Sequence, residues 1–139
     1  MTSPLTGSCL CGAVAYEADA LEPDMGHCHC RMCRKFHGAA FATFGEVRRE
    51  AFRWTQGREH LKTYTAPNGT KRVFCDTCGS SLTFEASNSD GSLVEFALGT
   101  LDSPCPQKPD AHIFTHYKAD WSSICDGLPV YGEGRNADD

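Results

Sequence analysis

Seven of the nine cysteines in this chain fall into three tight clusters. The clusters are Cys9-x-Cys11, Cys28-x-Cys30-x-x-Cys33 and Cys75-x-x-Cys78. A closed zinc site takes four protein ligands, whereas a catalytic site keeps three and leaves one position open for water or substrate. The first and last clusters together supply four thiols, and the middle cluster remains as a triad. The pattern therefore predicts two zinc ions per chain, a structural ion on the outer clusters and a catalytic ion on the triad.

Three basic residues, Arg31, Arg34 and Lys35, lie within or directly after the triad. Three thiolates on one Zn²⁺ leave a net negative charge, which weakens the ion as a Lewis acid unless positive charge lies nearby. The basic residues can supply that charge, and they can also attract a carboxylate of a substrate. We predict the binding role for Arg34, because a guanidinium holds a carboxylate through two parallel hydrogen bonds. The alternative is that all three are solvated residues of a turn.

The histidines near the clusters are expected to support the structure. His29 lies between two cysteines of the triad, and strand alternation would turn its side chain away from a metal that those cysteines face. We therefore expect it to pack or to support a ligand rather than to bind the metal. His27 and His112 can carry protons near neutral pH, but most such histidines are structural and we predict neither to be catalytic. Cys105 and Cys125 lie outside every cluster and are expected to be free thiols.

The composition is that of a soluble globular protein of 139 residues. Its length predicts a single domain over 5–131, followed by a flexible acidic tail over 132–139. A net charge of −5 argues against a nucleic-acid partner. No apolar run is long enough to span a membrane, and no export signal is visible at the N-terminus. Cysteines without an export signal are metal ligands or reactive thiols more often than disulfides, so we predict a cytoplasmic protein.

Short stretches rich in β-branched and aromatic residues, separated by turn signals, predict a mainly β fold. The expected strands are 13–18, 40–44, 52–54, 60–65, 72–74, 81–85, 93–98 and 112–114. The only helical candidate is a short turn over 31–37. The outer cysteine clusters then lie in turns at strand ends, where Gly12 and Gly79 supply the backbone freedom that tight turns need. Two such turns facing each other would form the four-sulfur site.

Three segments resemble the glutathione-dependent formaldehyde-activating enzyme family, whose domain is shared with centromere protein V. They are Gly7-Ser-Cys-Leu-Cys-Gly-Ala-Val-Ala-Tyr16, Cys28-His-Cys-Arg-Met-Cys-Arg34 with Gly38-Ala39, and Phe74-Cys-Asp-Thr-Cys-Gly-Ser80. The resemblance implies antiparallel sheets in a zinc-stabilised β-tent architecture, and the same division of cysteines into a structural and a catalytic site. It also implies a carbon–sulfur lyase that joins glutathione and formaldehyde to S-(hydroxymethyl)glutathione, or reverses that reaction. The chain is similar to a short form of the family, so the zinc sites transfer better than the identity of the substrate.

The leading hypothesis is a zinc-dependent lyase acting on a thiol–aldehyde adduct, with a small-molecule thiol and an aldehyde as partners and glutathione as one candidate thiol. Zinc suits this reaction because it lowers the pKa of a bound thiol or polarises a carbonyl oxygen. Two alternatives stay open: a zinc-stabilised interaction module without catalysis, and a cysteine redox enzyme with a metal-free triad. The zinc content separates them, since two ions favour the lyase and one ion favours either alternative. The oligomeric state is not predicted.

Overall fold

The computed structural model describes residues 4–135 of the chain and is mainly β, as the sequence predicts. These residues form two compact units, and each unit combines two separate stretches of sequence. Unit 1 contains the residues up to 23 together with 45–107, and unit 2 contains 24–44 together with the residues from 108 onward. The domain predicted over 5–131 therefore contains two interleaved units. Among the described residues, no helix is both long and apolar enough to cross a membrane.

Unit 1 contains a three-stranded antiparallel sheet in the order β1-β2-β5. Its strands are β1 (Leu5–Ser8), β2 (Ala15–Ala18) and β5 (Phe52–Gln56). Alternate residues of β2 are buried, which is the period expected of a strand with one face on a core. Tyr16 pairs with Gly7 across β1 and β2, and a Cβ atom at Gly7 would lie 2.2 Å from the tyrosine ring. Glycine is therefore required beneath that ring.

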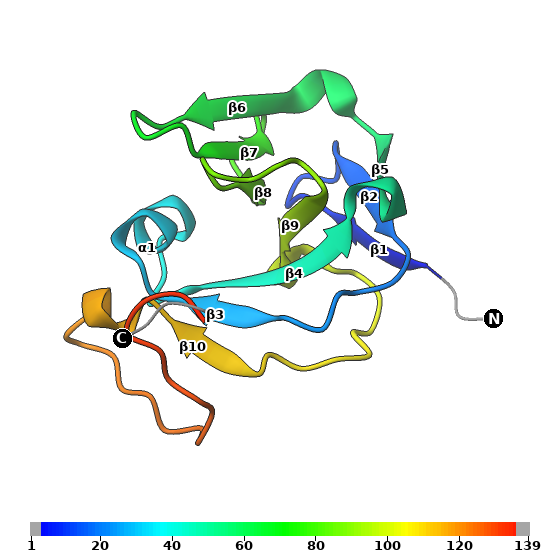
Figure 1. Ribbon diagram of the computed structural model, residues 1–139. Coiled ribbons are helices and arrows are strands. Elements are labelled where there is room, and N and C mark those ends of the chain that lie inside the picture. Colours follow the sequence, from blue (N-terminus) through cyan, green and yellow to red (C-terminus); the bar gives the residue numbers. More distant parts are fainter. Residues whose placement is uncertain (1–3, 136–139) are drawn as a thin grey trace. The chain divides into compact units, whose positions relative to one another are not determined.

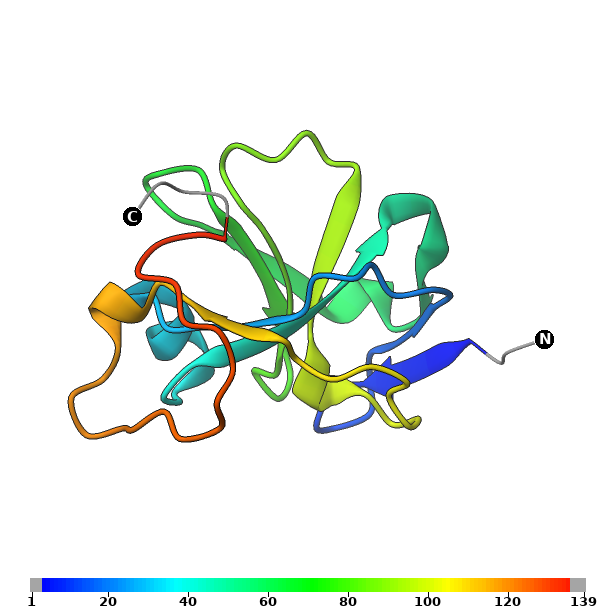
Figure 2. The same ribbon diagram turned by 60° about the horizontal axis from the view of Figure 1, so that its bottom comes forward.

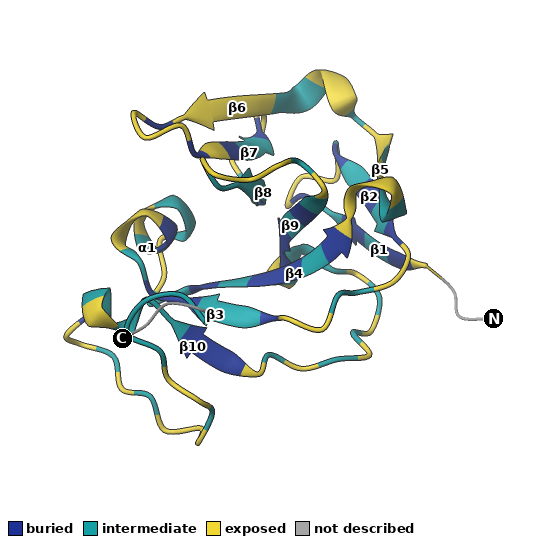
Figure 3. Cartoon of the chain, viewed as in Figure 1, coloured by how far each residue is buried: buried dark blue, intermediate teal, exposed yellow. Residues whose placement is uncertain are grey.

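The second group of strands in unit 1 runs in the order β9-β8-β7-β6, with β4 next to β9. Its strands are β4 (Ala42–Arg48), β6 (Leu61–Thr65), β7 (Lys71–Cys75), β8 (Ser81–Glu85) and β9 (Leu93–Ala97). β6, β7 and β8 lie side by side in Figure 1, and β6 is exposed along most of its length in Figure 3. The antiparallel pairing of β6 with β7 places Leu61 opposite Cys75, so the end of β7 that carries a clustered cysteine is held in register.

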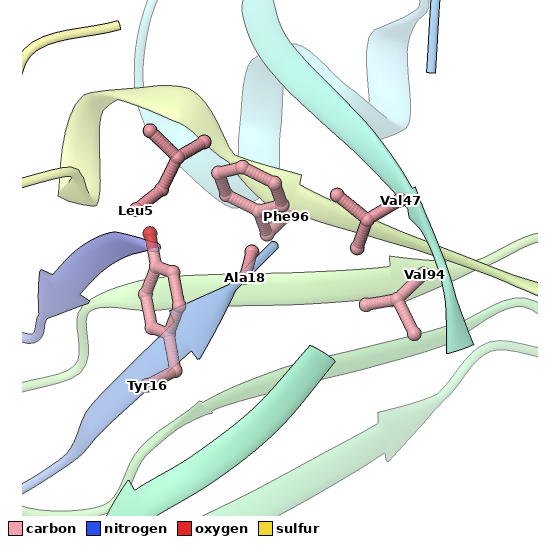
Figure 4. Close-up of a cluster of buried hydrophobic side chains, with 6 residues drawn as sticks. All are labelled: Leu5, Tyr16, Ala18, Val47, Val94 and Phe96. Atoms are coloured by element: carbon pink, nitrogen blue, oxygen red, sulfur yellow. The ribbon is translucent and has the colours of Figure 1, made fainter. Parts of the chain in front are cut away.

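Figure 4 shows the main apolar cluster of unit 1. Its buried members are Leu5, Tyr16, Ala18, Val47, Val94 and Phe96. Tyr16 stacks on Phe52 with ring centroids 5.1 Å apart, and its hydroxyl contacts Thr100 Oγ1 at 2.6 Å. Burial raises the pKa of Tyr16 to about 12, so the phenol stays protonated at neutral pH. Its hydroxyl has a hydrogen-bond partner, as buried tyrosines usually do. This core forms because β2, β4 and β9 each direct alternate apolar side chains to the same side.

Unit 2 is built on β3 (Gly26–Cys28), the first part of β4 and β10 (Ala111–Ile113). β3 pairs antiparallel with β4 and parallel with β10, which lies beside it in both views (Figures 1 and 2). The pairs β1-β2, β2-β5, β6-β7, β7-β8 and β8-β9 are antiparallel, as the family resemblance implies. A parallel pair requires a long connection, which here includes residues 45–107 of unit 1.

One short helix, α1 (Arg31–His37), follows β3 directly. The helix begins after Cys30, whose Sγ accepts a hydrogen bond from the Cys33 backbone N–H at 3.3 Å. It ends at Gly38, which adopts the left-handed conformation with φ of 60° that closes many helices. The short turn predicted over 31–37 is confirmed with the same bounds. Cys30 is therefore both a member of the triad and the residue that caps α1.

The structure also contains elements that the sequence did not predict. β1 and β3 were missed because they are short and contain glycine, which weakens the strand signal. The 3-10 helices in the described part of the chain are Arg49–Ala51, Arg58–His60, Leu98–Thr100 and Thr115–Tyr117. Within the predicted tail, Glu133 O accepts from Phe114 N at 2.9 Å and Arg135 forms an ion pair with Asp110. The last four residues of that tail, 136–139, lie outside the described residues.

Candidate metal centres

The outer cysteine clusters form two matching turns in unit 1. In the first turn, Cys9 O accepts from Gly12 N at 3.0 Å, and Cys9 N donates to Val14 O at 3.0 Å. In the second, Cys75 O accepts from Gly79 N at 2.8 Å, and Cys75 N donates to Ser80 O at 3.1 Å. Each turn thus curls the backbone around its first cysteine. A backbone wrapped in this way directs the sulfurs of both cysteines in the turn toward one point.

The four sulfurs of these turns converge, as the sequence predicts. All four Sγ atoms of Cys9, Cys11, Cys75 and Cys78 lie within 4.8 Å of one another. The Sγ atoms of Cys9 and Cys11 are 3.6 Å apart, and those of Cys11 and Cys75 are 3.9 Å apart. Sulfurs bound to one zinc ion at about 2.3 Å are separated by about 3.8 Å at the corners of a tetrahedron. The four thiols therefore fit a tetrahedral metal ion without rearrangement of the turns.

Hydrogen bonds to the sulfurs support this four-cysteine site. The Cys9 sulfur accepts from Val14 N at 3.3 Å, and the Cys75 sulfur accepts from Thr77 N at 3.4 Å. The Ser80 hydroxyl contacts Cys78 Sγ at 3.3 Å and is the main reason why the pKa of the Cys78 thiol falls to about 5. The same hydroxyl oxygen accepts from Leu10 N at 2.8 Å, so it joins the two turns. Such contacts stabilise thiolates, which are the form that binds metal.

The triad lies in unit 2, where the end of β3 meets the start of α1. Cys28 is the last residue of β3, Cys30 is the residue before the helix, and Cys33 lies in its first turn. The three sulfurs lie within 4.8 Å of one another. Cys28 and Cys33 are buried, whereas Cys30 is partly exposed. The triad is therefore held by one strand end and one capped helical turn, and one of its members reaches the surface.

The triad suits a cation because, without one, the negative charges of its three thiolates would repel one another. Hydrogen bonds with the Cys30 and Cys33 thiols, followed by burial, raise the pKa of the Cys28 thiol far above its ordinary value. A bound divalent cation would reverse that effect, because a coordinated thiol loses its proton. No fourth Cys, His, Asp or Glu side chain among residues 4–135 joins this group. Both predicted cysteine groups could thus hold a metal ion.

A basic hollow of about 470 Å³ lies on α1, the helix whose first turn contains Cys33. It is lined by Arg31, Arg34, Lys35, Gly38, Ala39 and Trp121. Arg34 donates from Nη1 to Tyr117 O at 2.9 Å, so part of its guanidinium is used to hold the backbone. Arg31 lies over the Tyr117 ring at 5.3 Å, a cation–π contact that orients it. The Trp121 side chain is largely exposed and offers a flat apolar surface at the same hollow.

The histidines of unit 2 form a hydrogen-bonded chain that the sequence did not indicate. His29 is fully buried, and its Nε2 lies 2.8 Å from His112 Nδ1. His112 is also buried, and its Nε2 lies 2.8 Å from Asp126 Oδ2. The hydrogen bond from His112 lowers the pKa of the Asp126 carboxyl, and burial lowers the pKa of His29 to about 4. His29 is thus a neutral, packed imidazole, in agreement with the supporting role expected for it.

The two remaining thiols belong to no cluster, and one hollow of unit 1 is lined by none of the clustered cysteines. Cys105 Sγ donates to Gln107 O at 3.0 Å, Cys125 is exposed, and neither joins a convergent group. A hollow of about 310 Å³ in unit 1 is lined mainly by apolar and hydroxyl side chains, with Arg49, Lys71 and Glu85 at its charged positions. It is lined by no cysteine or histidine.

Comparison with known proteins assigns the chain to a family. A family model described as glutathione-dependent formaldehyde-activating enzyme matches residues 4–117, a segment that contains all seven clustered cysteines. The chain belongs to this family. The match confirms the resemblance seen in the three cysteine segments. It also leaves Trp121 and Asp126 outside the matched part of the chain.

Individual relatives agree with this assignment. The chain is 30% identical over 128 residues to a provisionally named glutathione-dependent formaldehyde-activating enzyme of Halomonas elongata, covering 86% of this chain and 80% of the relative. It is 30% identical over 82 residues to an uncharacterized lyase of Schizosaccharomyces pombe, covering 59% of this chain but only 58% of that protein. A crystal structure of a Rhodobacter sphaeroides protein is similar with a TM-score of 0.60 and 28% identity, over 73% of this chain and 91% of that chain. The family description and the names of the first two relatives all describe enzymes.

Proposed function

We propose that the chain is a zinc-dependent carbon–sulfur lyase that forms or cleaves an adduct between a small anionic thiol and an aldehyde. The observation that carries this proposal is that the triad and the basic hollow both belong to the short segment around α1. A reactive thiol site and a surface for carboxylates are thereby offered by the same short stretch of chain. Formaldehyde and glutathione, which the family description names, are the first substrates to test.

The proposed reaction is an addition. The thiol sulfur forms a bond to the aldehyde carbon, and the proton of the thiol ends on the aldehyde oxygen, so that the product is a hydroxyalkyl thioether. Cys28, Cys30 and Cys33 would hold the catalytic zinc. When bound, the ion supplies positive charge that lowers the pKa of a thiol or polarises a carbonyl oxygen. The reverse reaction breaks the same carbon–sulfur bond and returns the proton to sulfur.

The residues of the basic hollow would orient the thiol substrate. Arg31 and Lys35 are exposed and can bind carboxylates, and the contact with Tyr117 limits the freedom of Arg31. Arg34, the arginine predicted to bind substrate, would contribute positive charge and those N–H groups that Tyr117 O does not use. Trp121 would cover the apolar part of the bound molecule. Fixing the substrate in this way favours addition because the reacting atoms are held in position.

The four-cysteine site of unit 1 would hold the structural zinc. Its four thiols complete the coordination of one ion, which leaves no position for a substrate. None of the nine cysteines, which all lie within residues 4–135, forms a disulfide, and thiols without disulfides are usual in the cytoplasm. We accordingly propose two zinc ions per chain and a cytoplasmic location.

The proposal is tested by metal analysis together with a thiol screen. The purified protein should contain two zinc ions per chain, whereas one ion would support a redox enzyme or an interaction module. The addition of a thiol to ¹³C-formaldehyde, measured by exchange NMR, should be faster with the protein than without it. The enzyme should favour glutathione, which carries two carboxylates, over 2-mercaptoethanol, which carries none.

A matched pair of variants tests the role of the hollow. Arg31→Gln should lower kcat/KM for glutathione about 10-fold, the effect of losing one charge-assisted contact, and should leave the rate with 2-mercaptoethanol unchanged. Arg58→Gln, at another exposed arginine but in unit 1, should change neither rate. An equal fall with both thiols would contradict a role of the hollow in binding carboxylates. No acceleration with any thiol or aldehyde would contradict the lyase itself.

A further inference from the structure

The two side-chain directions of β3 carry different chemistry. Cys28 belongs to the triad, whereas His27, the residue before it, points to the opposite side because side chains alternate along a strand. The parallel register of β3 and β10 places His112 directly beside His27, and the ring centroids are 4.7 Å apart. The Cys28 sulfur therefore lies on one side of β3, and the His27 imidazole lies on the other side, next to His112 of β10.

An aspartate from a distant turn completes this second group. One ligand atom from each of His27, His112 and Asp126 lies within 4.8 Å of the others. Asp126 reaches the pair through its Oδ2, while its Oδ1 accepts from Leu128 N at 3.1 Å. The carboxylate is thus held by its own turn, and it is the solvent-exposed member of the group. The structure brings together two nitrogens and one oxygen at a position that solvent can reach.

The hydrogen bonds of His27 and His112 indicate which ring nitrogen of each would bind a metal ion. His27 Nδ1 is held by Thr43 Oγ1 at 2.7 Å, and Thr43 is the register partner of His27 on β4. His112 Nδ1 is held by His29 Nε2 at 2.8 Å. The nitrogen left on His27 is Nε2, and the Nε2 of His112 is the atom that lies 2.8 Å from Asp126 Oδ2. Histidines that bind metals usually have the other nitrogen fixed by a hydrogen bond in this manner, because that bond sets the orientation of the ring.

We propose that His27, His112 and Asp126 form a third cation site, which binds a divalent transition metal of borderline softness such as Zn²⁺, Co²⁺ or Ni²⁺. Two imidazoles and one carboxylate favour these ions, whereas thiolate sites favour softer ones. The site differs from both cysteine centres in its ligands. It also depends on Asp126, which lies outside the segment matched by the family model.

Binding of such an ion requires only a small movement. Nitrogen and oxygen ligands at about 2.1 Å from one zinc ion are about 3.4 Å apart at the corners of a tetrahedron. His112 Nε2 and Asp126 Oδ2 are 2.8 Å apart, so the carboxylate must move away by roughly half an ångström. The proton on His112 Nε2 must leave that nitrogen, so that neutral His112 carries its proton on Nδ1 and donates it to His29 Nε2, while His29 carries its own proton on Nδ1. The bound ion would then tie the turn of Asp126 to β3 and β10.

The test uses cobalt as a spectroscopic probe on the full chain with its thiolate centres filled with zinc. Equilibrium dialysis should show one further Co²⁺ per chain, and its absorption should lack the thiolate-to-cobalt charge-transfer bands near 300–400 nm that cysteine ligands produce. Asp126→Asn keeps a hydrogen-bond acceptor for His112 but removes the charge, and it should weaken this binding at least about 10-fold. Asp120→Asn, at an exposed aspartate of the same segment that belongs to no convergent group, should leave it unchanged.

A second variant tests His27, the ligand on β3. His27→Gln should weaken the binding to the same extent while leaving the circular dichroism spectrum unchanged. Three outcomes would overturn the proposal: no further cobalt bound, equal binding by the Asp126→Asn variant and the unaltered chain, or charge-transfer bands from the added ion. The first outcome would mean that His112 and Asp126 form a hydrogen bond only, and the last would mean that cobalt enters a cysteine centre.

Discussion

The two cysteine centres use the same side chain in two different ways. In unit 1 the four ligands come from two turns that are 64 residues apart between Cys11 and Cys75, whereas in unit 2 the three ligands come from residues 28–33. A metal ion in the first centre closes a long loop of chain and opposes the conformational entropy of that loop. A metal ion in the second centre closes almost none. The comparison shows that the separation of ligands along the chain, rather than their number alone, decides how much a metal stabilises the fold.

The surroundings of the two centres also favour a structural role for the four-cysteine site and a catalytic role for the triad. Cys9 and Cys75 are buried in an apolar cluster with Val14 and Leu82, which leaves little room for a substrate. The triad instead lies on the segment that also carries the basic hollow on α1. Four sulfurs complete the coordination of an ion and suit a structural role, whereas three sulfurs leave a position open, and positive charge on the same helix suits chemistry on an anionic molecule. The following predictions test this contrast, from the largest expected effect to the smallest.

The largest effect is expected from Cys75→Ser. It removes a ligand that joins two distant turns, and structural zinc contributes on the order of 10 kcal/mol, comparable with the whole net stability of a domain. We expect loss of soluble folded protein, measured by yield, zinc content and circular dichroism. Cys105→Ser is the matched control, because this thiol lies in unit 1 but belongs to no metal group, and it should fold normally.

Removal of zinc from the unaltered chain separates metal binding from packing in this experiment. Cys75 is completely buried, so its replacement also disturbs the apolar cluster. A strong chelator should therefore lower the melting temperature of the unaltered protein to a similar extent. If the chelated protein lost both ions and melted as before, the structural assignment of the four-cysteine site would be wrong.

A smaller effect on stability is expected from Cys30→Ser. Serine is a good residue before a helix and can accept the hydrogen bond from Cys33 N, so α1 should keep its cap. We expect the variant to lose about one zinc ion per chain and its lyase activity, with a fall in melting temperature of only a few degrees. Unfolding as complete as that of the Cys75 variant would remove the distinction between the two centres.

A pH experiment tests the stability of unit 1 through a group away from the metals. Burial raises the pKa of the Glu95 carboxyl to about 7, Glu46 adds to the rise and Arg72 opposes it. A carboxyl with a raised pKa binds more protons in the folded state, so its contribution to stability is present at low pH and is lost as the pH rises from about 4.5 to about 7. Glu95→Gln should therefore be more stable than the unaltered protein at pH 8, by up to about 3 kcal/mol, and equally stable at pH 4.5.

The measurement is urea unfolding at several pH values with both zinc centres filled. Glu85→Gln is the control, at a carboxyl on the neighbouring strand β8. A gain for Glu95→Gln that did not change between pH 4.5 and pH 8 would contradict burial of a charge as the cause.

The smallest effect is expected from Ser80→Ala, which removes the hydroxyl that joins the two turns of the four-cysteine site. Loss of its bonds to Leu10 N and Cys78 Sγ should cost about 1 kcal/mol and should raise the pKa of the Cys78 thiol. We expect about 10-fold weaker zinc binding at this site, measured by competition with a chelator, and no change at the triad. Ser89→Ala, in an exposed turn of the same unit, should leave zinc affinity at both sites unchanged. Equal weakening at both sites would show that Ser80 acts on general stability.

The cysteine spacing by itself determined most of the candidate site. The division into four and three thiols follows from the sequence because each cluster is short, and the local backbone alone brings its sulfurs together. The helix over Arg31–His37 follows for a similar reason, since its cap and its ending glycine are local features. Most strands were also predicted, because alternating apolar residues reflect local burial.

Only the tertiary structure decided which distant groups meet. The parallel pair of β3 and β10 brings together residues about 85 positions apart, and no local pattern specifies such a partner. The chain from His29 through His112 to Asp126 depends on that pair, as does the group of His27, His112 and Asp126. Trp121 likewise joins the basic hollow through the fold of unit 2, from a segment far along the chain. Local spacing therefore identified the sulfur ligands, whereas strand pairing between distant segments created the imidazole group and the border of the hollow.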